Sequence, residues 1–235
     1  MPLALRTFVY IIARRTTFVK QMFVCFPKYF AGGEKGKAET KGAGKSYDVV
    51  YKKPQKGASM LKPIQLDLPY PSLDCITCDL KSAQIVFPAY ASAHSELTAI
   101  LQYIYHSFNF KGRCDNETAD TLEGIALAEM HHLDILGSML LKLGADPVYV
   151  SSYPPTGFNF YSSSAVSYSK SVRKMLMDDL SGELCAIEGY NKILCRLCNE
   201  EVAAVITRIK LDEELHVKIL KERMNALFCD CNHNC

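Results

Sequence analysis

The last long stretch of the sequence, residues 200–227, restricts the fold more than any other feature. Six of its residues, most of them apolar, recur in alternating steps of four and three, which is the spacing of one face of an α-helix. That face comprises Val202, Ile206, Ile209, Glu213, His216 and Leu220. A carboxylate and an imidazole therefore lie among side chains that a helix buries, and burying them is costly unless something binds them.

Three earlier stretches repeat this spacing and predict helices at about residues 88–108, 119–143 and 167–197. The helix at 119–143 places Glu129 and His132 on its apolar face and His131 beside that face. On the buried face of each of the other two helices, a Glu is followed two turns later by a Tyr. These faces comprise Ala93, Glu96, Ile100, Tyr103 and Ser107 in one helix, and Val172, Leu176, Asp179, Glu183, Ile187, Tyr190 and Leu194 in the other.

The connections between these helices predict their arrangement. The first and second helices are joined by a short loop, as are the third and fourth. Between the second and third lies a longer stretch, GADPVYVSSYPPTGFNFYSSS, which is rich in Pro, Gly, Ser and aromatic residues. We therefore expect an all-α protein, a four-helix bundle with one long crossover between helices two and three.

The order of the polar residues is itself repeated. Glu-x6-Tyr followed by Glu-x-x-His occurs in helices one and two, and again in helices three and four. Packed about an approximate two-fold axis, the two halves place four carboxylates and two imidazoles around one point. This set matches the ligands of dinuclear carboxylate bundles, and its oxygen-rich chemistry favours two iron or two manganese ions over zinc. The predicted metal ligands, which would act catalytically through the metals, are Glu96, Glu129, His132, Glu183, Glu213 and His216.

Other polar residues near these faces have two interpretations. Tyr103 and Tyr190 can hydrogen-bond the ligands, or they can be core aromatic residues whose hydroxyls are satisfied elsewhere. Asp179 and Asp212 can support the ligands, although Asp179 is also compatible with a partly exposed position. The remaining histidines, His94, His106 and His131, are expected on surfaces or flanks.

The residues before and after the predicted helices form three further segments. Residues 1–59 contain no acid in their first thirty positions and are then rich in Gly and Lys, which predicts a disordered basic extension. A presequence or secretory signal would share this composition, but Arg14 and Arg15 interrupt the apolar run and no convincing cleavage site follows. Residues 60–86 form a Pro-bearing segment that leads into the bundle of residues 87–228, and residues 229–235 form a Cys-rich tail.

Charge and cysteine content restrict the partners and the compartment. A net charge of +2 gives no bias toward nucleic acid, and no apolar run approaches the roughly 20 residues of a membrane helix. The 10 cysteines are scattered, several within predicted helices, which favours reduced thiols in a cytoplasmic protein. The pairs Cys75/Cys78 and Cys195/Cys198 could form a four-cysteine iron site, but CRLC lacks the Gly and Pro that shape such a knuckle.

The segments SELTAILQYIYHSF, LEGIALAEMHHLDILGSMLLKLGADP, GELCAIEGY and IKLDEELHVKIL resemble the ferritin-like superfamily. The resemblance covers roughly residues 69–227 and is greatest to rubrerythrin-type domains and their manganese-catalase relatives, some of them associated with spore coats. It carries over the same six ligands, and it implies a bacterial origin and redox chemistry with hydrogen peroxide or oxygen. Nothing after helix four could form a rubredoxin module, so an iron enzyme would need an external electron donor.

Three functions follow from these observations. The leading hypothesis is an oxidoreductase that acts on hydrogen peroxide or oxygen, as a peroxidase with iron or a catalase with manganese. The second is ferrous-iron oxidation and iron handling, and the third is a structural, spore-coat-type protein that retains the fold. We expect a homo-oligomer in the bacterial cytoplasm, with spore association as a further option.

Overall fold

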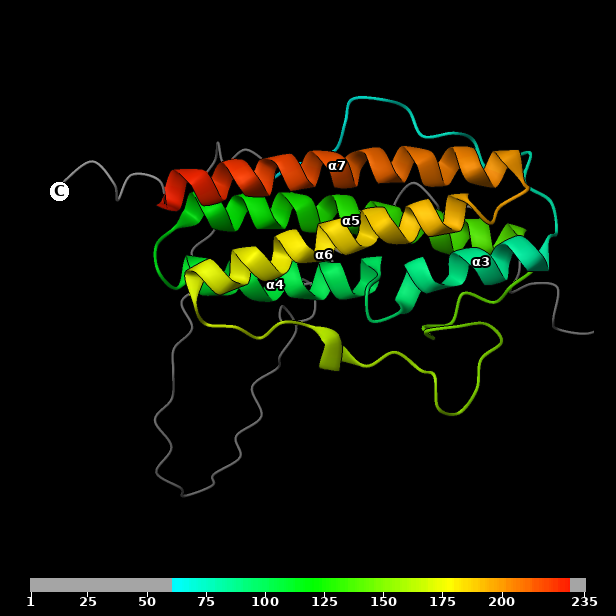
Figure 1. Ribbon diagram of the computed structural model, residues 1–235, viewed down its shortest axis with the longest axis horizontal. Coiled ribbons are helices and arrows are strands. Elements are labelled where there is room, and N and C mark those ends of the chain that lie inside the picture. The colour runs from blue at the N-terminus through cyan, green and yellow to red at the C-terminus, as the bar shows by residue number, and fades with distance from the viewer. Residues whose placement is uncertain (1–60, 229–235) are drawn as a thin grey trace, which may run out of the picture. The chain divides into compact units, whose positions relative to one another are not determined.

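The computed structural model describes residues 61–228, and these residues form an all-α bundle (Figure 1). The four long helices lie side by side, and a shorter helix, α3, precedes them. The helices are α3 (Leu80–Ala91), α4 (Glu96–Lys111), α5 (Asn116–Lys142), α6 (Val172–Leu194) and α7 (Glu200–Phe228), with a 3₁₀ turn at Ser163–Ala165. The predicted extension at 1–59 and tail at 229–235 lie outside the described residues.

The crossover confirms the predicted connectivity. It follows α5, runs along the outside of the bundle past the 3₁₀ turn, and returns to the start of α6 (Figure 1). Gly144 begins it with a φ of +89°, a backbone conformation that glycine adopts without strain. A Cβ at this position would lie 2.8 Å from the Cys78 sulfur, so this turn has no room for a side chain.

The prediction of one helix over residues 88–108 is wrong in detail, because two helices occupy this region. Pro88 lies inside α3 rather than in a first turn, and residues 92–95 separate α3 from α4. The Ser92 carbonyl accepts hydrogen bonds from the hydroxyls of Ser95 (2.7 Å) and Thr98 (2.9 Å). Such side-chain bonds offer the backbone an alternative to the helical ladder, and Ala93 is consequently exposed rather than on the buried face.

The other predicted helices have ends within a few residues of those observed. The Asp115 side chain caps α5 by accepting a hydrogen bond from the Thr118 amide at 3.0 Å. The third helix begins later than predicted, at Val172, because Ser167 is held outside it by a 2.8 Å bond from its amide to the Gln102 side chain.

The core consists of two apolar clusters at different levels of the bundle. One is built around Phe87, Leu136 and Ile206, and the other around Phe110, Leu122 and Leu176. On α7, Ile209 belongs to the first cluster and Leu220 to the second. The residues between these two positions therefore lie at mid-bundle, where the predicted polar side chains are found.

The lead-in segment, residues 61–79, packs against α5 and α7. The Ile64 amide donates to the Gly124 carbonyl at 2.9 Å, and a Cβ on Gly124 would lie 2.8 Å from the Ile64 side chain. The Arg208 guanidinium donates to the carbonyls of Leu66 and Leu68 at 2.9–3.2 Å. Glycine at position 124 thus lets the segment approach the helix closely.

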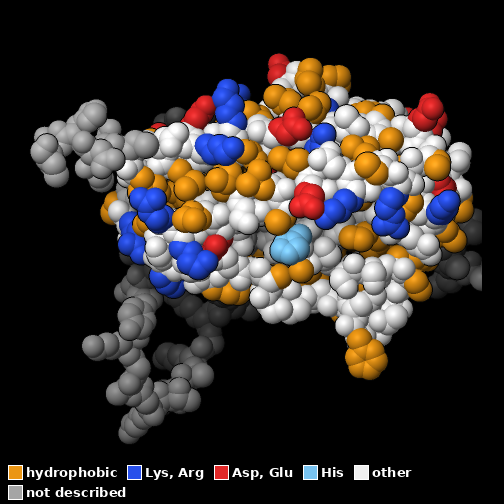
Figure 2. All heavy atoms as spheres, viewed as in Figure 1, with side chains coloured by type: hydrophobic (Ala, Val, Ile, Leu, Met, Phe, Trp, Pro, Cys, Tyr) orange, Lys and Arg blue, Asp and Glu red, His pale blue; other side chains and the backbone are white. Residues whose placement is uncertain are grey.

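The described surface has mixed charge. Figure 2 shows Lys and Arg side chains interspersed with Asp and Glu on the viewed face. Across residues 61–228 no helix combines the length and apolarity that a bilayer crossing requires. The six cysteines of this range are exposed free thiols.

Candidate metal centre

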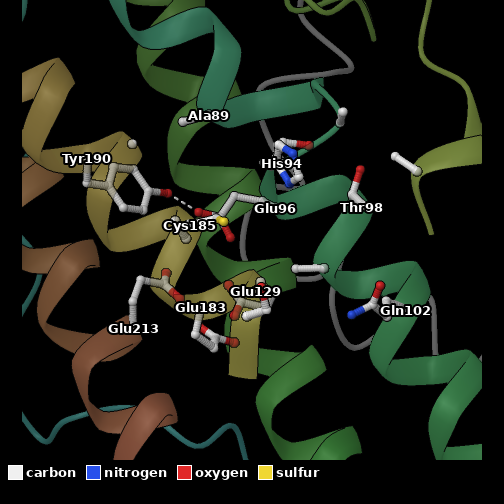
Figure 3. Close-up of a pocket in the computed structure, with 18 of the residues that line it drawn as sticks. Ala89, His94, Glu96, Thr98, Gln102, Glu129, Glu183, Cys185, Tyr190 and Glu213 are labelled. Carbon is white, nitrogen blue, oxygen red and sulfur yellow. Dashed lines mark hydrogen bonds between the residues drawn. The ribbon is translucent and has the colours of Figure 1, made fainter. Parts of the chain in front are cut away.

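All six predicted ligand residues converge at mid-bundle. They come from α4 (Glu96), α5 (Glu129 and His132), α6 (Glu183) and α7 (Glu213 and His216), and each is buried. Figure 3 shows the four carboxylates directed toward one another from four different helices. Their exposed fractions are 4% or less, so water cannot solvate them as it would at a surface.

The six residues form two overlapping groups that could each hold a metal ion. The first group is Glu96, Glu129, His132 and Glu213, and the second is Glu129, Glu183, Glu213 and His216. Within each group, one donor atom per residue lies within 4.8 Å of all the others. Glu129 and Glu213 belong to both groups, whereas each group has its own third Glu and its own His.

The two shared carboxylates each divide their oxygens between the two groups. Glu129 Oε2 lies 2.9 Å from His132 Nδ1, and Glu129 Oε1 lies 3.1 Å from His216 Nδ1. Glu213 repeats this arrangement, with Oε1 3.2 Å from His132 Nδ1 and Oε2 3.4 Å from His216 Nδ1. Each of these two carboxylates would therefore offer one oxygen to each group if cations were bound.

The outer nitrogens of the two imidazoles have different partners. His216 Nε2 lies 2.8 Å from the Ile64 carbonyl, which can only accept, so this nitrogen carries the proton. His132 Nε2 lies 3.1 Å from Asp212 Oδ2 and 3.2 Å from the Tyr70 hydroxyl. In the neutral imidazoles these contacts leave Nδ1 as the nitrogen that faces the carboxylates and can accept a cation.

Asp212 is the centre of a buried network behind His132. It accepts hydrogen bonds from the Tyr70 hydroxyl and, at 2.8 Å, from the Leu66 amide, and it pairs with Arg208 at 2.7 Å. Burial acts to raise its pKa, but the hydrogen bonds from His132, Arg208 and Tyr70 outweigh burial and hold the pKa well below its usual range. Burial and Asp212 together raise the pKa of Tyr70 to about 12.

The two tyrosines cross between the halves of the bundle. Tyr103 of α4 donates its hydroxyl to Glu183 of α6, and Tyr190 of α6 donates to Glu96 of α4. Figure 3 marks the second of these bonds. Each unshared carboxylate is thus held by a phenol from the opposite half.

The pKa values of the two unshared carboxyls are both shifted upward. Burial raises the pKa of Glu96 well above its usual range, and the charges of Glu129 and Glu213 raise it further. Burial, followed by the charge of Glu213, likewise raises the pKa of Glu183.

The shared carboxyls and the imidazoles stabilise each other as ions. Burial acts to raise the pKa of Glu129, but the charge of His216 and the hydrogen bond from His132 hold it well below its usual range. The pKa of Glu213 is also lowered, because bonds from both imidazoles outweigh burial and the charge of Glu129. Burial acts to lower the pKa of His132 and His216, yet the surrounding carboxylates raise both well above the usual imidazole value.

These residues fit a pair of divalent cations. Four buried atoms at the centre lie in ion-pair contacts but have no partner in good hydrogen-bond geometry within the described residues, and they are Glu129 Oε1, Glu183 Oε2, Glu213 Oε1 and His216 Nδ1. Buried polar atoms without good hydrogen bonds are costly, and bound cations could satisfy them. Four carboxylates would also balance the charge of two divalent ions.

The prediction of a surface or flank position for His106 is wrong. His106 is fully buried on α4, and its Nδ1 lies 2.8 Å from Asp179 Oδ1 on α6. Asp179 is also buried rather than partly exposed, and Gln102 donates to it at 2.9 Å. His94 and His131 are exposed, as predicted.

Three groups that support the imidazoles or Asp212 could not be predicted from the sequence. Tyr70 and the Ile64 carbonyl come from the lead-in segment, in which no periodic pattern indicates a role. Arg208 lies one turn before Asp212, and this spacing was the only available signal for their pairing.

A pocket of about 610 Å³ lies between α4 and α6 and reaches the carboxylates. Glu96, Glu129, Glu183 and Glu213 contribute to its inner lining (Figure 3). Its outer lining includes residues from α3, α6 and the crossover. A small molecule can therefore reach the centre from this side of the bundle.

A helical bundle with a buried carboxylate–imidazole cluster that could hold metal defines the class of this protein. The ferritin-like domain profile matches residues 91–227, and the chain belongs to this family. No curated protein sequence matches the chain.

Solved structures of other proteins share the fold. The manganese catalase KatB from Anabaena has a TM-score of 0.62 and 18% identity, covering 72% of this chain and 82% of its own. The Rhodobacter capsulatus bacterioferritin, described with a metal-free dinuclear site and heme iron, has a TM-score of 0.53 and 22% identity over 66% of this chain and 89% of its own. The Mycobacterium tuberculosis bacterioferritin BfrA also has a TM-score of 0.53, with 20% identity over 64% of this chain and 88% of its own.

Proposed function

We propose that this protein is a dinuclear manganese or iron oxidoreductase that acts on hydrogen peroxide. The observation that carries the proposal is the pair of shared carboxylates, each of which directs one oxygen to each imidazole. Glu96 and His132 would complete one metal site, and Glu183 and His216 the other. Two redox-active ions held this way supply the two electrons exchanged when a peroxide bond is broken.

The chain's own residues have distinct tasks in this proposal. Tyr190 and Tyr103 hold the unshared carboxylates by donating to one oxygen each, which leaves the other oxygen for a cation. Asp212 and the Ile64 carbonyl fix the rotation and protonation of the imidazoles. The pocket admits the substrate from one side, while the lead-in segment covers the opposite side near α5 and α7.

The identity of the metal divides the proposal into two reactions. With manganese, a second peroxide molecule supplies the electrons and the enzyme is a catalase, which the likeness to KatB supports. With iron, an external donor must supply them and the enzyme is a peroxidase. Oxygen as the oxidant, the homo-oligomer and the cytoplasmic location remain predictions.

Ferrous-iron oxidation is a second candidate. The pocket that reaches the centre is also lined by Asp178 and Asp179, so acidic groups continue outward from the proposed ligands. The bacterioferritin neighbours support this candidate. Iron uptake well beyond two ions per chain would favour iron handling over peroxide turnover.

The first test is metal content per chain, measured by plasma mass spectrometry after purification without added metal. We expect about two manganese or iron ions per chain, and loss of both in the Glu129→Gln/Glu213→Gln double variant, because both groups share these residues. Oxygen release and peroxide loss then separate catalase from peroxidase. If the wild type binds no metal even after anaerobic reconstitution, the enzymatic proposal fails and a structural role, including the spore-coat type, takes its place.

A further inference from the structure

The crossover between α5 and α6 has the composition of an interface rather than of an ordinary surface loop. Residues 147–169 contain no charged residue and consist largely of Ser, Pro and aromatic residues. At the centre of protein–protein interfaces, charged residues are depleted and aromatic residues enriched in the same way. Figure 2 shows the lobe that this loop forms beneath the bundle as white and orange spheres. Such a segment is suited to contact with another protein surface.

Part of the crossover forms a compact unit of two antiparallel segments, which we call the crossover ribbon (residues 149–161). The Ser151 amide donates to the Asn159 carbonyl at 2.8 Å, and the two segments form a β-bridge. The Asn159 side chain closes the tip by donating to the carbonyls of Ser152 (2.7 Å) and Pro154 (3.3 Å). The ribbon therefore has a defined shape before any partner binds, which lowers the entropy that binding costs.

Packing against α3 fixes the crossover ribbon to the bundle. Val150 is fully buried and belongs to the apolar cluster around Phe87. The Tyr149 ring stacks on Tyr90 with 5.5 Å between the ring centroids, and the Tyr153 ring lies 5.3 Å from that of Phe87. Three residues of the ribbon thus hold it to the core.

Three aromatic side chains of this fixed ribbon are exposed. Phe158 at the tip is completely exposed (103%), and Phe160 and Tyr149 are 61% and 50% exposed. At about 200 Å² per aromatic side chain, these fractions amount to roughly 400 Å², half of the ~800 Å² that each partner buries in a standard interface. Single exposed apolar residues are common on surfaces, but three aromatic rings on one ribbon form a patch that burial would stabilise.

A groove of about 160 Å³ lies beside the crossover ribbon, and every residue in its lining is uncharged. The lining includes Ala91 and Ala93 around the end of α3, Phe160 of the ribbon, and Ser162 and Ala165 after it. A cavity of about 150 Å³ is large enough to bind benzene, so this groove has room for one phenyl ring. A projecting ring and a groove of matching size therefore lie next to each other on one face of the protein.

We propose that a second copy of this chain docks on the crossover ribbon about a two-fold axis, with Phe158 of each copy in the groove of the other. A two-fold interface brings the same patch together from both sides, so it requires a projection and its complement within one patch. It also brings like charges together, and an uncharged patch avoids that repulsion. A lipid surface is the other partner to consider for exposed aromatic rings, but basic residues beside the rings would favour it, and residues 147–169 have none.

The proposed interface also reaches the entrance of the larger pocket. Ala93 and Ala165 line both the groove and the 610 Å³ pocket that leads to the carboxylates. A phenyl ring in the groove would therefore lie beside this entrance, and the second copy would form part of the path to the centre. Because only surface residues are involved, the interface should form with or without metal.

Sedimentation velocity of the full chain over a range of concentrations measures the association. We expect the wild type to reach twice the 26.3 kDa mass of the chain, or an even multiple of it. Phe158→Asp, and Ala93→Trp, which fills the groove, should each raise the dissociation constant at least tenfold. Both positions are exposed, so both variants should keep the wild-type fold, which circular dichroism verifies. Phe108→Asp is the matched control, because Phe108 is 61% exposed on α4 and lines no part of the groove, and it should associate like the wild type.

Mixing the two variants gives a result that poor folding cannot imitate. A dimer of Phe158→Asp has open grooves but no ring to fill them, and a dimer of Ala93→Trp has rings but no open groove. A mixed dimer contains one matching ring and groove. We therefore expect the equimolar mixture to associate more tightly than either variant alone, and a mass tag on one variant identifies the mixed species.

Four outcomes would overturn this interface while leaving the metal proposal intact. The first is a wild type that stays monomeric at every concentration. The second is an assembly that Phe158→Asp and Ala93→Trp do not weaken, because another face would then hold it together. The third is weakening by both variants without recovery in the mixture, which contradicts the pairing of ring and groove. The fourth is a monomeric wild type that binds phosphatidylcholine vesicles and loses this binding in Phe158→Asp, which would assign the ribbon to a lipid surface.

Discussion

Loading two divalent ions into the metal-free protein should release about four protons per chain near neutral pH. The raised pKa values of Glu96 and Glu183 favour the protonated form of both carboxyls in the metal-free protein. The raised pKa values of His132 and His216 likewise favour protonated imidazoles. Two carboxyls and two imidazoles therefore give up four protons when their donor atoms accept cations.

The net charge of the six clustered residues supports a release of about four protons. In the metal-free state the anionic Glu129 and Glu213 balance two imidazolium ions, so the net charge is zero. In the loaded state four carboxylates balance two divalent ions, and the net charge is again zero. A buried cluster that stays neutral avoids the several kcal/mol per ion that an unbalanced charge costs. Lowering the pH should accordingly weaken metal binding.

Calorimetric titration in two buffers of different ionisation enthalpy measures the protons released. The Glu96→Gln variant is the matched control, because Gln has no proton to lose and the number should fall by about one. The Tyr70→Phe variant changes the network behind His132 but none of the four protons, and it should leave the number unchanged. Release of one proton or fewer in the wild type would refute the reasoning, because the cluster would then be deprotonated before metal arrives.

Three further predictions concern stability. The metal-free protein should lose thermal stability as the pH rises above 6.5, the ordinary imidazole pKa. His132 and His216 bind their protons more tightly in the folded than in the unfolded protein, so their contribution to stability is complete below that pH and is lost as the pH rises through their raised folded-state pKa values. Scanning calorimetry of metal-free and loaded protein at pH 6 and 9 tests this, and an unchanged midpoint would contradict it. Asp212→Ala should cost about 3–5 kcal/mol in urea unfolding, because buried Arg208 loses its charged partner; a cost below 1 kcal/mol would refute that role. Gly144→Ala should cost about 1–2 kcal/mol at its positive φ, whereas Gly157→Ala, with open space around it, should stay within about 0.5 kcal/mol.

The six clustered residues could be predicted because each stands on a periodic apolar face. Glu213 and His216 interrupt such a face on α7, and periodicity alone is enough to place them inward. The order of the motifs in two halves then restricts how the four faces meet. Local pattern and global fold agree here, which is why the prediction from sequence was possible.

The misplaced residues depend on partners that a single helix does not reveal. His106 can be buried because its ring Nδ1 lies within hydrogen-bond distance of the Asp179 carboxylate, on a helix far away in sequence. An imidazole for which the sequence shows no such partner is more often exposed. The Ile64 carbonyl reaches His216 through the backbone, and any residue type could supply that oxygen. The break before α4 depends on hydrogen bonds from the Ser95 and Thr98 hydroxyls to the Ser92 carbonyl, which compete with the backbone bonds of a helix. The amino-acid composition of this segment does not predict which set of bonds forms.

The different partners of the two imidazole outer nitrogens make an apparently symmetric centre chemically unequal. His132 is backed by a carboxylate and His216 by a neutral carbonyl, although their inner nitrogens face equivalent carboxylates. A carboxylate behind an imidazole increases its basicity as a ligand more than a carbonyl does. The two imidazoles would therefore offer unequal donor strength to any cations bound here, with His132 the stronger donor.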